Sequence, residues 1–179
     1  MKKQGFTLIE LMVVIVIMGI LAAVAVPKLF GMIAKSKASE VGPAAGTYVK
    51  LQDAYAAETG AAGSWSMIGY IAPGTKAEDG KSSTTTVFKY LDDFEPTAGN
   101  TTLVGALSTA ATGQAAWGAE ALTALNDCAV SSKWTVNIKK GATNSSGFLV
   151  EYIAKDPQKG GNDDTDCKSL TANFHNIGK

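Results

Sequence analysis

A long apolar run near the N-terminus constrains the fold of this chain more than any other feature. Residues 11–26 are sixteen consecutive residues without a charge, and Glu10 is the only charged residue between Phe6 and Val26. At 1.5 Å per residue, residues 6–26 would form a helix of roughly 31 Å, about the thickness of the hydrocarbon core of a bilayer. We therefore expect a membrane-spanning helix at the start of the chain.

The basic residues around this run indicate its orientation. Lys2 and Lys3 precede it, and no comparable cluster follows before Lys35 and Lys37. The positive-inside rule then favours a cytoplasmic N-terminus and an exported remainder. An ordinary secretory signal peptide is the alternative, because residues 23–25 read Ala-Val-Ala and satisfy an A-x-A cleavage pattern. The carboxylate inside the apolar run, the length of the run and the lack of a polar stretch before the supposed cleavage site all argue against it.

The stretch KKQGFTLIELMVVIVIMGILAAVAVP resembles the N-terminus of type IV pilins and of the related type II secretion pseudopilins. The resemblance comprises a short basic leader ending in Gly5, an aromatic residue at Phe6, the FTLIE run, the interior Gly19, and Pro27 at the end of the apolar stretch. It implies that residues 1–5 are a leader peptide. A prepilin peptidase would cut between Gly5 and Phe6 and methylate the new amine of Phe6.

The resemblance also implies a use for Glu10, which would otherwise be a costly charge in a membrane span. In this family the matching glutamate pairs with the N-terminal amine of the adjacent subunit during filament assembly, with Gly19 and Pro27 in the same assembly helix. A buried carboxylate is destabilising unless a cation meets it, so the physics agrees with this role. The alternative is that Glu10 lies near the lipid headgroups of a simple anchor.

The implied partners are other copies of the chain, the prepilin peptidase, the inner-membrane pilus assembly machinery with its cytoplasmic ATPase, and membrane lipid before assembly. The implied location is the bacterial inner membrane, and then an extracellular pilus used for adhesion or surface motility.

After Pro27 the sequence becomes amphipathic and predicts that one helix continues to about residue 59. An apolar stripe recurs at three- and four-residue steps and comprises Val41, Ala44, Ala45, Tyr48, Leu51, Ala54 and Tyr55. We divide the helix into an assembly part, residues 6–27, and an amphipathic part, residues 28–59. A continuous helix from residue 6 to 59 would be roughly 80 Å long, so its first half must project from any small domain. Bends are expected at Pro27 and at Gly42–Pro43.

The remainder predicts a connecting loop, residues 60–83, and a β domain, residues 84–179. Expected anchors of the loop are Trp65, Met67, Ile68, Tyr70 and Ile71. Expected strands are residues 84–91, 133–140 and 148–154, the last two forming a hairpin. Residues 101–109 and 117–125 fit strand or helix, and strands are favoured by context. The fold class is therefore α+β, the pilin fold, in which a long kinked helix packs on an antiparallel sheet.

Cys128 and Cys167 are the only cysteines. Outside the cytoplasm they could form one disulfide, which would close the final loop and stabilise the fold by roughly 4 kcal/mol. Two reduced, buried cysteines are the alternative.

The sequence argues against several kinds of chemistry. All 16 basic residues are lysines, so the usual arginine readers of nucleic acid are absent and no nucleic-acid partner is predicted. His175 is the only histidine, which excludes histidine-based triads and multi-histidine metal sites. The stretch GTKAEDGKS has one residue too many between its glycines for a phosphate-binding loop. Asp163, Asp164 and Asp166 are a weak calcium candidate. We otherwise expect no cofactor and no enzymatic activity.

Two alternatives to a type IV pilin stay open at this point. One is a type II secretion pseudopilin, which forms a short periplasmic filament. The other is a signal-anchored or secreted binding domain.

Overall fold

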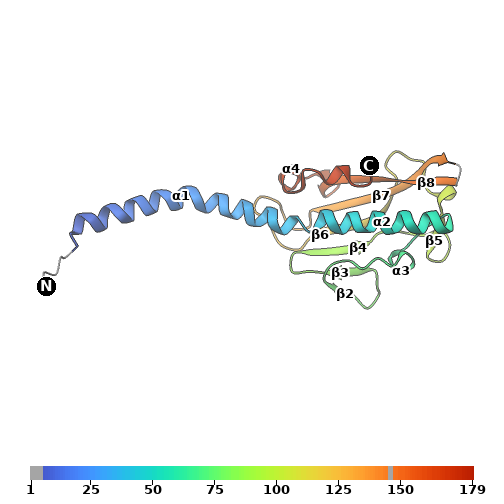
Figure 1. The fold of residues 1–179 in the computed structure, drawn as a ribbon, viewed down its shortest axis with the longest axis horizontal. Helices are drawn as coiled ribbons and strands as arrows, with labels where there is room; N and C mark the ends of the chain where they lie inside the picture. Colours follow the sequence, from blue (N-terminus) through green and yellow to red (C-terminus); the bar gives the residue numbers. More distant parts are fainter. Residues whose placement is uncertain (1–5, 145–146) are drawn as a thin grey trace.

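A long helix projects from a β-rich head in the computed structural model, which describes residues 6–144 and 147–179. Figure 1 shows the N-terminal half of the helix extending away from the head, while the C-terminal half lies along it. The predicted α+β class, with a long helix, an antiparallel sheet and a disulfide, is confirmed.

The helix consists of α1 (Leu8–Ala38) and α2 (Val41–Thr59), separated by a turn at Ser39 and Glu40. It ends where the sequence predicted, because Gly60 takes the left-handed conformation, with φ 68°, that a side chain disfavours. Pro27 lies inside α1, which is curved but unbroken in Figure 1. Pro43 lies in the first turn of α2, where a missing backbone N–H is tolerated. The interruption therefore falls directly before Gly42 and Pro43, and not at Pro27.

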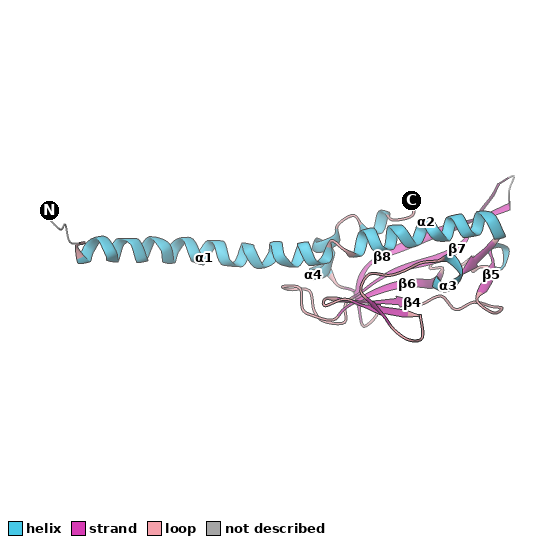
Figure 2. Ribbon diagram, turned by 60° about the horizontal axis from the view of Figure 1, so that its bottom comes forward, coloured by secondary structure: helices cyan, strands magenta, loops and turns pink. Residues whose placement is uncertain are grey.

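The head is built on a seven-stranded antiparallel sheet, and α2 crosses one of its faces (Figure 2). The strand order is β2-β3-β4-β6-β7-β8-β9, so both edge strands are very short. The strands are β2 (Thr75–Lys76), β3 (Ser82–Thr84), β4 (Phe88–Asp92), β6 (Gln114–Ala121), β7 (Lys133–Asn144), β8 (Gly147–Lys159) and β9 (Asn162–Asp163). The predicted β7–β8 hairpin is confirmed and is longer than expected.

Short elements complete the head around this sheet. A second, two-stranded sheet pairs β1 with β5. The remaining elements are β1 (Ala61–Gly63), α3 (Trp65–Ile68), β5 (Thr101–Leu103), α4 (Thr165–Lys168) and three 3₁₀ turns, η1 (Val104–Ala106), η2 (Ser169–Thr171) and η3 (Phe174–Asn176).

Several expectations for the head were wrong in detail. Residues 84–91 form the end of β3 and most of β4 instead of one strand, because the Thr85 hydroxyl accepts the backbone N–H groups of Val87 and Phe88 and turns the chain. Residues 101–109 are strand only as far as Leu103, and residues 117–125 only as far as Ala121. Residues 60–83 contain short strands and α3, so they are not irregular throughout.

The loop anchors were also only partly right. Trp65, Ile68 and Tyr70 are buried, but Met67 is 42% exposed and Ile71 is 81% exposed. These two side chains therefore contribute little to the core of the head.

The face of α2 that packs on the sheet matches the predicted apolar stripe as far as Tyr48 and differs from it after that residue. Val41, Ala44, Ala45 and Tyr48 are buried as expected, and the next buried residues are Val49 and Gln52 instead of Leu51 and Ala54. Gln52 can be buried because its amide, in the orientation that satisfies both groups, pairs with the N–H and C=O of Gly63 at 3.0 Å each.

Tyrosine hydroxyls connect the helix to the sheet inside this core. Tyr70 donates to the carbonyl of Ala44 at 3.1 Å and accepts from Trp117 Nε1 at 3.1 Å. From β8, Tyr152 donates to Asp53 at 2.7 Å. Burial raises the pKa of Tyr70 to about 12, so its hydroxyl is protonated and can donate at neutral pH. These bonds hold α2 at one position on the sheet.

A further polar contact fixes the turn between α1 and α2. Glu40 Oε1 accepts hydrogen bonds from Tyr90 Oη at 3.0 Å and from Thr85 Oγ1 at 3.1 Å. Both donors belong to the head, so the carboxylate ties the interruption of the helix to the β3–β4 region. In the sequence Glu40 looked like an ordinary surface charge, because its partners are 45 and 50 residues away.

The disulfide predicted as one of two states of the cysteines is present. Cys128 and Cys167 are bonded, and both are buried. The bond ties the loop after β6 to α4 and thereby holds the C-terminal segment against the head.

Replacing both cysteines by serine should lower the free energy of unfolding by about 4 kcal/mol, because the bond closes a loop of 39 residues in the unfolded chain. Urea denaturation of the full chain in detergent, with and without reductant, would measure this. If the double variant matched the oxidised wild type, the disulfide would carry no stability.

Replacing Glu40 by alanine should lower the free energy of unfolding by about 1–3 kcal/mol, because two head groups lose a charged acceptor. Glu58→Ala, at an exposed position of the same helix, is the matched control and should change it by less than about 0.5 kcal/mol. A double-mutant cycle with Tyr90→Phe would show coupling between the two residues. Additive effects of Glu40→Ala and Tyr90→Phe would contradict the contact.

Candidate assembly interface

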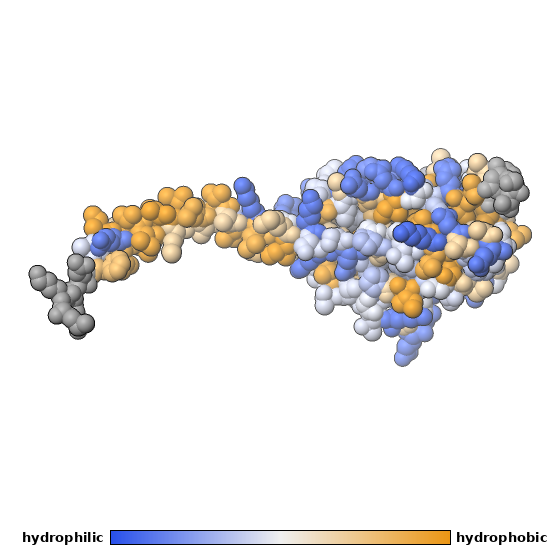
Figure 3. Space-filling model, viewed as in Figure 1, coloured by the Kyte–Doolittle hydropathy of each residue, from blue (hydrophilic) through white to orange (hydrophobic). Residues whose placement is uncertain are grey.

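The first 28 described residues present an apolar surface that the head does not cover. The exposed fractions of its large hydrophobic residues run from 43% at Ile33 to 84% at Phe6 and Leu8, and Ala34 is the first buried residue of α1. Figure 3 shows this surface as an almost continuous apolar rod. The helix Leu8–Thr59 is the one helix of the described residues that is long and apolar enough to cross a membrane. An exposed apolar patch of this size requires lipid or protein around it.

The beginning of α1 is held by a reciprocal cap between Thr7 and Glu10. Glu10 Oε2 accepts the backbone N–H of Thr7 at 2.8 Å and the Thr7 hydroxyl at 2.5 Å, while Thr7 Oγ1 accepts the Glu10 N–H at 3.4 Å. This is a capping box, which satisfies two orphan donors of the first turn. The negative charge also lies at the positive end of the helix dipole.

The same cap leaves part of the Glu10 carboxylate free. Both bonds from Thr7 end on Oε2, and Oε1 accepts none within residues 6–144 and 147–179. Phe6 is exposed immediately before the cap, whereas Gly5 lies outside the described residues. The geometry therefore places an accessible carboxylate oxygen one turn from the predicted new N-terminus at Phe6. The assembly role of Glu10 stays a prediction.

Gly19 and Pro27 lie on the same exposed rod. A Cβ at Gly19 would meet no described atom within 4 Å, so packing among the described residues does not explain this glycine. Pro27 cannot donate a hydrogen bond to Ala23, which leaves a weak point in an otherwise regular helix. Their proposed parts in assembly concern contacts with other molecules and stay predictions.

Two of the three aspartates of the calcium candidate, Asp163 and Asp164, have other side-chain partners. The Asp164 side chain caps α4 by accepting the N–H groups of Asp166 and Cys167, and it accepts the Ser132 hydroxyl at 2.6 Å. Asp163 accepts from Gln158 at 3.2 Å. Among the described residues, the group of metal-type ligands within reach of one another is Asp164 with the two bonded cysteines, whose sulfurs are committed to the disulfide. Calcium would have to displace the cap of α4, and its binding stays a prediction.

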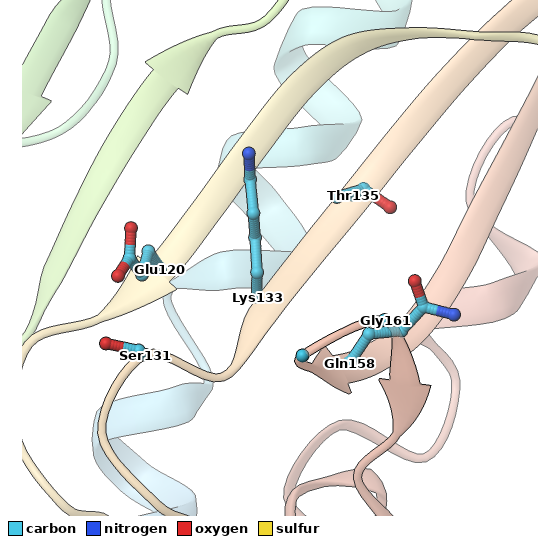
Figure 4. A pocket seen from close by; sticks show the side chains of 7 residues that line it. Glu120, Ser131, Lys133, Thr135, Gln158 and Gly161 are labelled. Atoms are coloured by element: carbon cyan, nitrogen blue, oxygen red, sulfur yellow. The ribbon is translucent and has the colours of Figure 1, made fainter.

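A shallow polar pocket lies on the face of the sheet opposite α2. Its volume is about 320 Å³, and Lys133 of β7 extends between Glu120 and Thr135 in Figure 4. The Lys133 ammonium is already paired with Asp93 at 2.7 Å. The ammonium of the lysine at the centre of this pocket is therefore already used in an ion pair.

The lone histidine lies beside the ion pair of Lys168 and Asp156. His175 Nδ1 lies 3.5 Å from Asp156, whose other oxygen binds Lys168 at 2.7 Å. Its side chain is 42% exposed. The cluster attaches the C-terminal segment to β8.

Comparisons with known proteins match the N-terminal segment. The family model of the prokaryotic N-terminal methylation motif matches residues 1–26. Over 39 residues, 22% of this chain, the sequence is 56% identical to the type IV major pilin protein PilA of Myxococcus xanthus and to the type IV major fimbrial protein FimA of Dichelobacter nodosus. The matches span 18% and 25% of the lengths of those proteins, so they do not extend over most of either chain.

The methylation motif, the projecting apolar helix and the α+β head are all features that the resemblance implied, and the head also contains the disulfide. The predicted resemblance is confirmed: this chain carries the prokaryotic N-terminal methylation motif and is similar in its N-terminal segment to type IV major pilins.

Proposed function

We propose that this chain is a type IV pilin, a structural and non-catalytic subunit of a helical surface filament. The observation that carries the proposal is the methylation motif placed directly at the start of an uncovered apolar helix whose single early charge is Glu10. The peptidase would cut between Gly5 and Phe6 and methylate Phe6. The span itself would be retained, so that the processed chain stays in the inner membrane until it is assembled.

Assembly would replace lipid by protein around α1. Bundling several α1 helices covers apolar surface that one head cannot reach, and small residues at positions 19, 22, 23 and 25 allow helices to approach closely. Inside such a bundle the Glu10 carboxylate would be destabilising without a cation. The amine created at Phe6 of a neighbouring subunit would supply that cation, and Glu10 Oε1, which accepts no hydrogen bond from the residues that the structure describes, would receive it.

The heads would form the outer surface of the filament, because α2 fixes them at the far end of the projecting helix. Adhesion and surface motility would then depend on the exposed loops of the head. The assembly machinery with its cytoplasmic ATPase would extract the subunit from the membrane, and the finished pilus would be extracellular. No nucleic-acid partner is part of this proposal.

The N-terminus of the processed protein distinguishes this proposal from a secreted binding domain. Mass spectrometry of the N-terminal peptide should show a chain that begins at N-methylated Phe6. A chain that begins after Ala25 would instead indicate signal peptidase cleavage and would refute the proposal.

Replacing Glu10 by valine should leave the subunit in the membrane but reduce methylation or filament assembly. Loss of one member of a buried charge pair costs about 3–5 kcal/mol, which corresponds to more than about a hundredfold in an assembly equilibrium. Glu58→Val, an exposed position at the end of α2, is the control. Normal methylation and normal filaments from Glu10→Val would contradict the role assigned to Glu10.

Electron microscopy of material sheared from cells separates a pilin from a pseudopilin. Abundant long filaments composed of this chain would support the pilin assignment. Their absence from cells that process the chain at Phe6 would favour a short periplasmic filament of the secretion type.

A further inference from the structure

An apolar groove lies where the projecting helix enters the head. It has a volume of about 430 Å³ and runs between the α1–α2 junction and the C-terminal segment after α4. It is lined by Lys35, Ala38, Ser39, Gly42, Leu170, Thr171, Ala172, Asn173, Phe174 and Ile177. Most of these side chains are apolar or small. The disulfide and the Asp156 cluster hold the C-terminal wall in place, so the groove is a feature of the folded head.

The groove leaves space for a partner segment to approach the backbone of the α1–α2 helix closely. A Cβ at Gly42 would meet nothing within 4 Å among the described residues, and the same is true of Gly31 and Gly46. Gly42 and Gly46 are four residues apart, and Gly31 lies eleven residues, about three turns, before Gly42. The three positions therefore fall on one side of the helix, the side that carries the groove.

Packing among the described residues of one chain does not explain these three glycines. None has a positive φ, and each lies inside a helix, where glycine is destabilising by about 0.5–1 kcal/mol relative to alanine. Space at the backbone on one helix face is used when a second helix packs there. The occupant of the groove is then expected to be a helix without charges along the contact.

The groove is continuous with the uncovered surface of α1. Lys35 on its rim follows Gly31 by one turn, and the exposed Met32 and Ile33 lie directly before it. The longest uncharged apolar helix available to this groove is α1 itself, which lacks any charge over residues 11–26 and has no cover of its own. The groove and the exposed apolar surface of α1 would cover each other if α1 of one copy packed into the groove of another copy.

We propose that the groove receives the α1 helix of a second copy of this chain, with Gly42 at the point of closest approach. This inference rests on the proposed function, because it specifies how neighbouring subunits pack. It assigns an assembly role to the head and its disulfide-held C-terminal segment, in addition to the role of the projecting helix. In a filament, each head would thus contact the α1 helix of a neighbouring subunit in addition to packing on the α2 helix of its own chain.

Site-specific crosslinking in the full chain tests the contact. Ala172→Cys, exposed in the groove, would be labelled with a benzophenone maleimide in sheared filaments, since both native cysteines are bonded. Photolysis should link it to a peptide from residues 6–33 of another copy. Ala115→Cys, exposed on the other face of the sheet, is the matched control and should not link to that peptide. Links from Ala172 only to other heads, or none, would overturn the proposal.

A second variant measures the importance of the space. Gly42→Leu fills the groove and should reduce filament yield by about tenfold or more, because overpacking excludes the neighbouring helix. Its melting temperature as a detergent-solubilised subunit should not fall, since a Cβ at Gly42 meets no described atom within 4 Å and the groove leaves room for the rest of the side chain. Thr47→Leu, an exposed position on another side of α2, should leave the yield unchanged.

The outcomes separate the two proposals. Wild-type filaments together with normal yield from Gly42→Leu would refute the groove contact and leave the pilin assignment intact. A wild-type chain that is processed elsewhere or forms no filament would refute the proposed function, and the groove contact with it.

Discussion

The packing of one half of a single long helix against a sheet, with the other half left bare, is the constraint on which the rest of this structure depends. Burial of Val41, Ala45 and Tyr48 on the sheet gives α2 a cover that α1 lacks. Exposure of the apolar surface of α1 to water is unfavourable, so α1 must lie in lipid or against other chains. The projecting shape of the molecule and its proposed assembly both follow from this difference in burial between α1 and α2.

The attachment of the helix to the head is correspondingly polar and specific. Glu40 binds two head hydroxyls at the turn between α1 and α2, and Tyr70 and Tyr152 donate to α2 from the loop and from β8. Apolar packing alone would allow α2 to slide or rotate on the sheet, whereas buried hydrogen bonds are lost if it does. The direction in which α1 leaves the head is therefore set by a few side chains near the junction.

The two ends of the exposed helix solve different physical problems. At its beginning, Glu10 accepts the Thr7 cap on one oxygen, and its other oxygen accepts no hydrogen bond from the described residues, an arrangement that suits a cation without unwinding the first turn. At its end, the groove beside Gly42 offers apolar surface and close access to the backbone. Glu10 would pair with the charged amine of a neighbour, and the groove would receive an apolar helix. Together the two contacts would define the register of a neighbouring helix.

Local patterns in the sequence were sufficient to predict the helix, because an uncharged run, a stripe at helical spacing and the Thr59–Gly60 stop depend on near neighbours. They also predicted the β7–β8 hairpin, and the cysteine count allowed the disulfide. Details of the head could not be read in the same way. The turn at Thr85, the burial of Gln52 and the partners of Glu40 depend on residues far apart in the chain, whose approach is decided by the sheet. The sequence by itself determined that this chain has an apolar helix with one early charge and a leader-like start. Only the tertiary structure decided which side chains of α2 are covered and where a groove opens, because coverage is a property of surfaces brought together by folding.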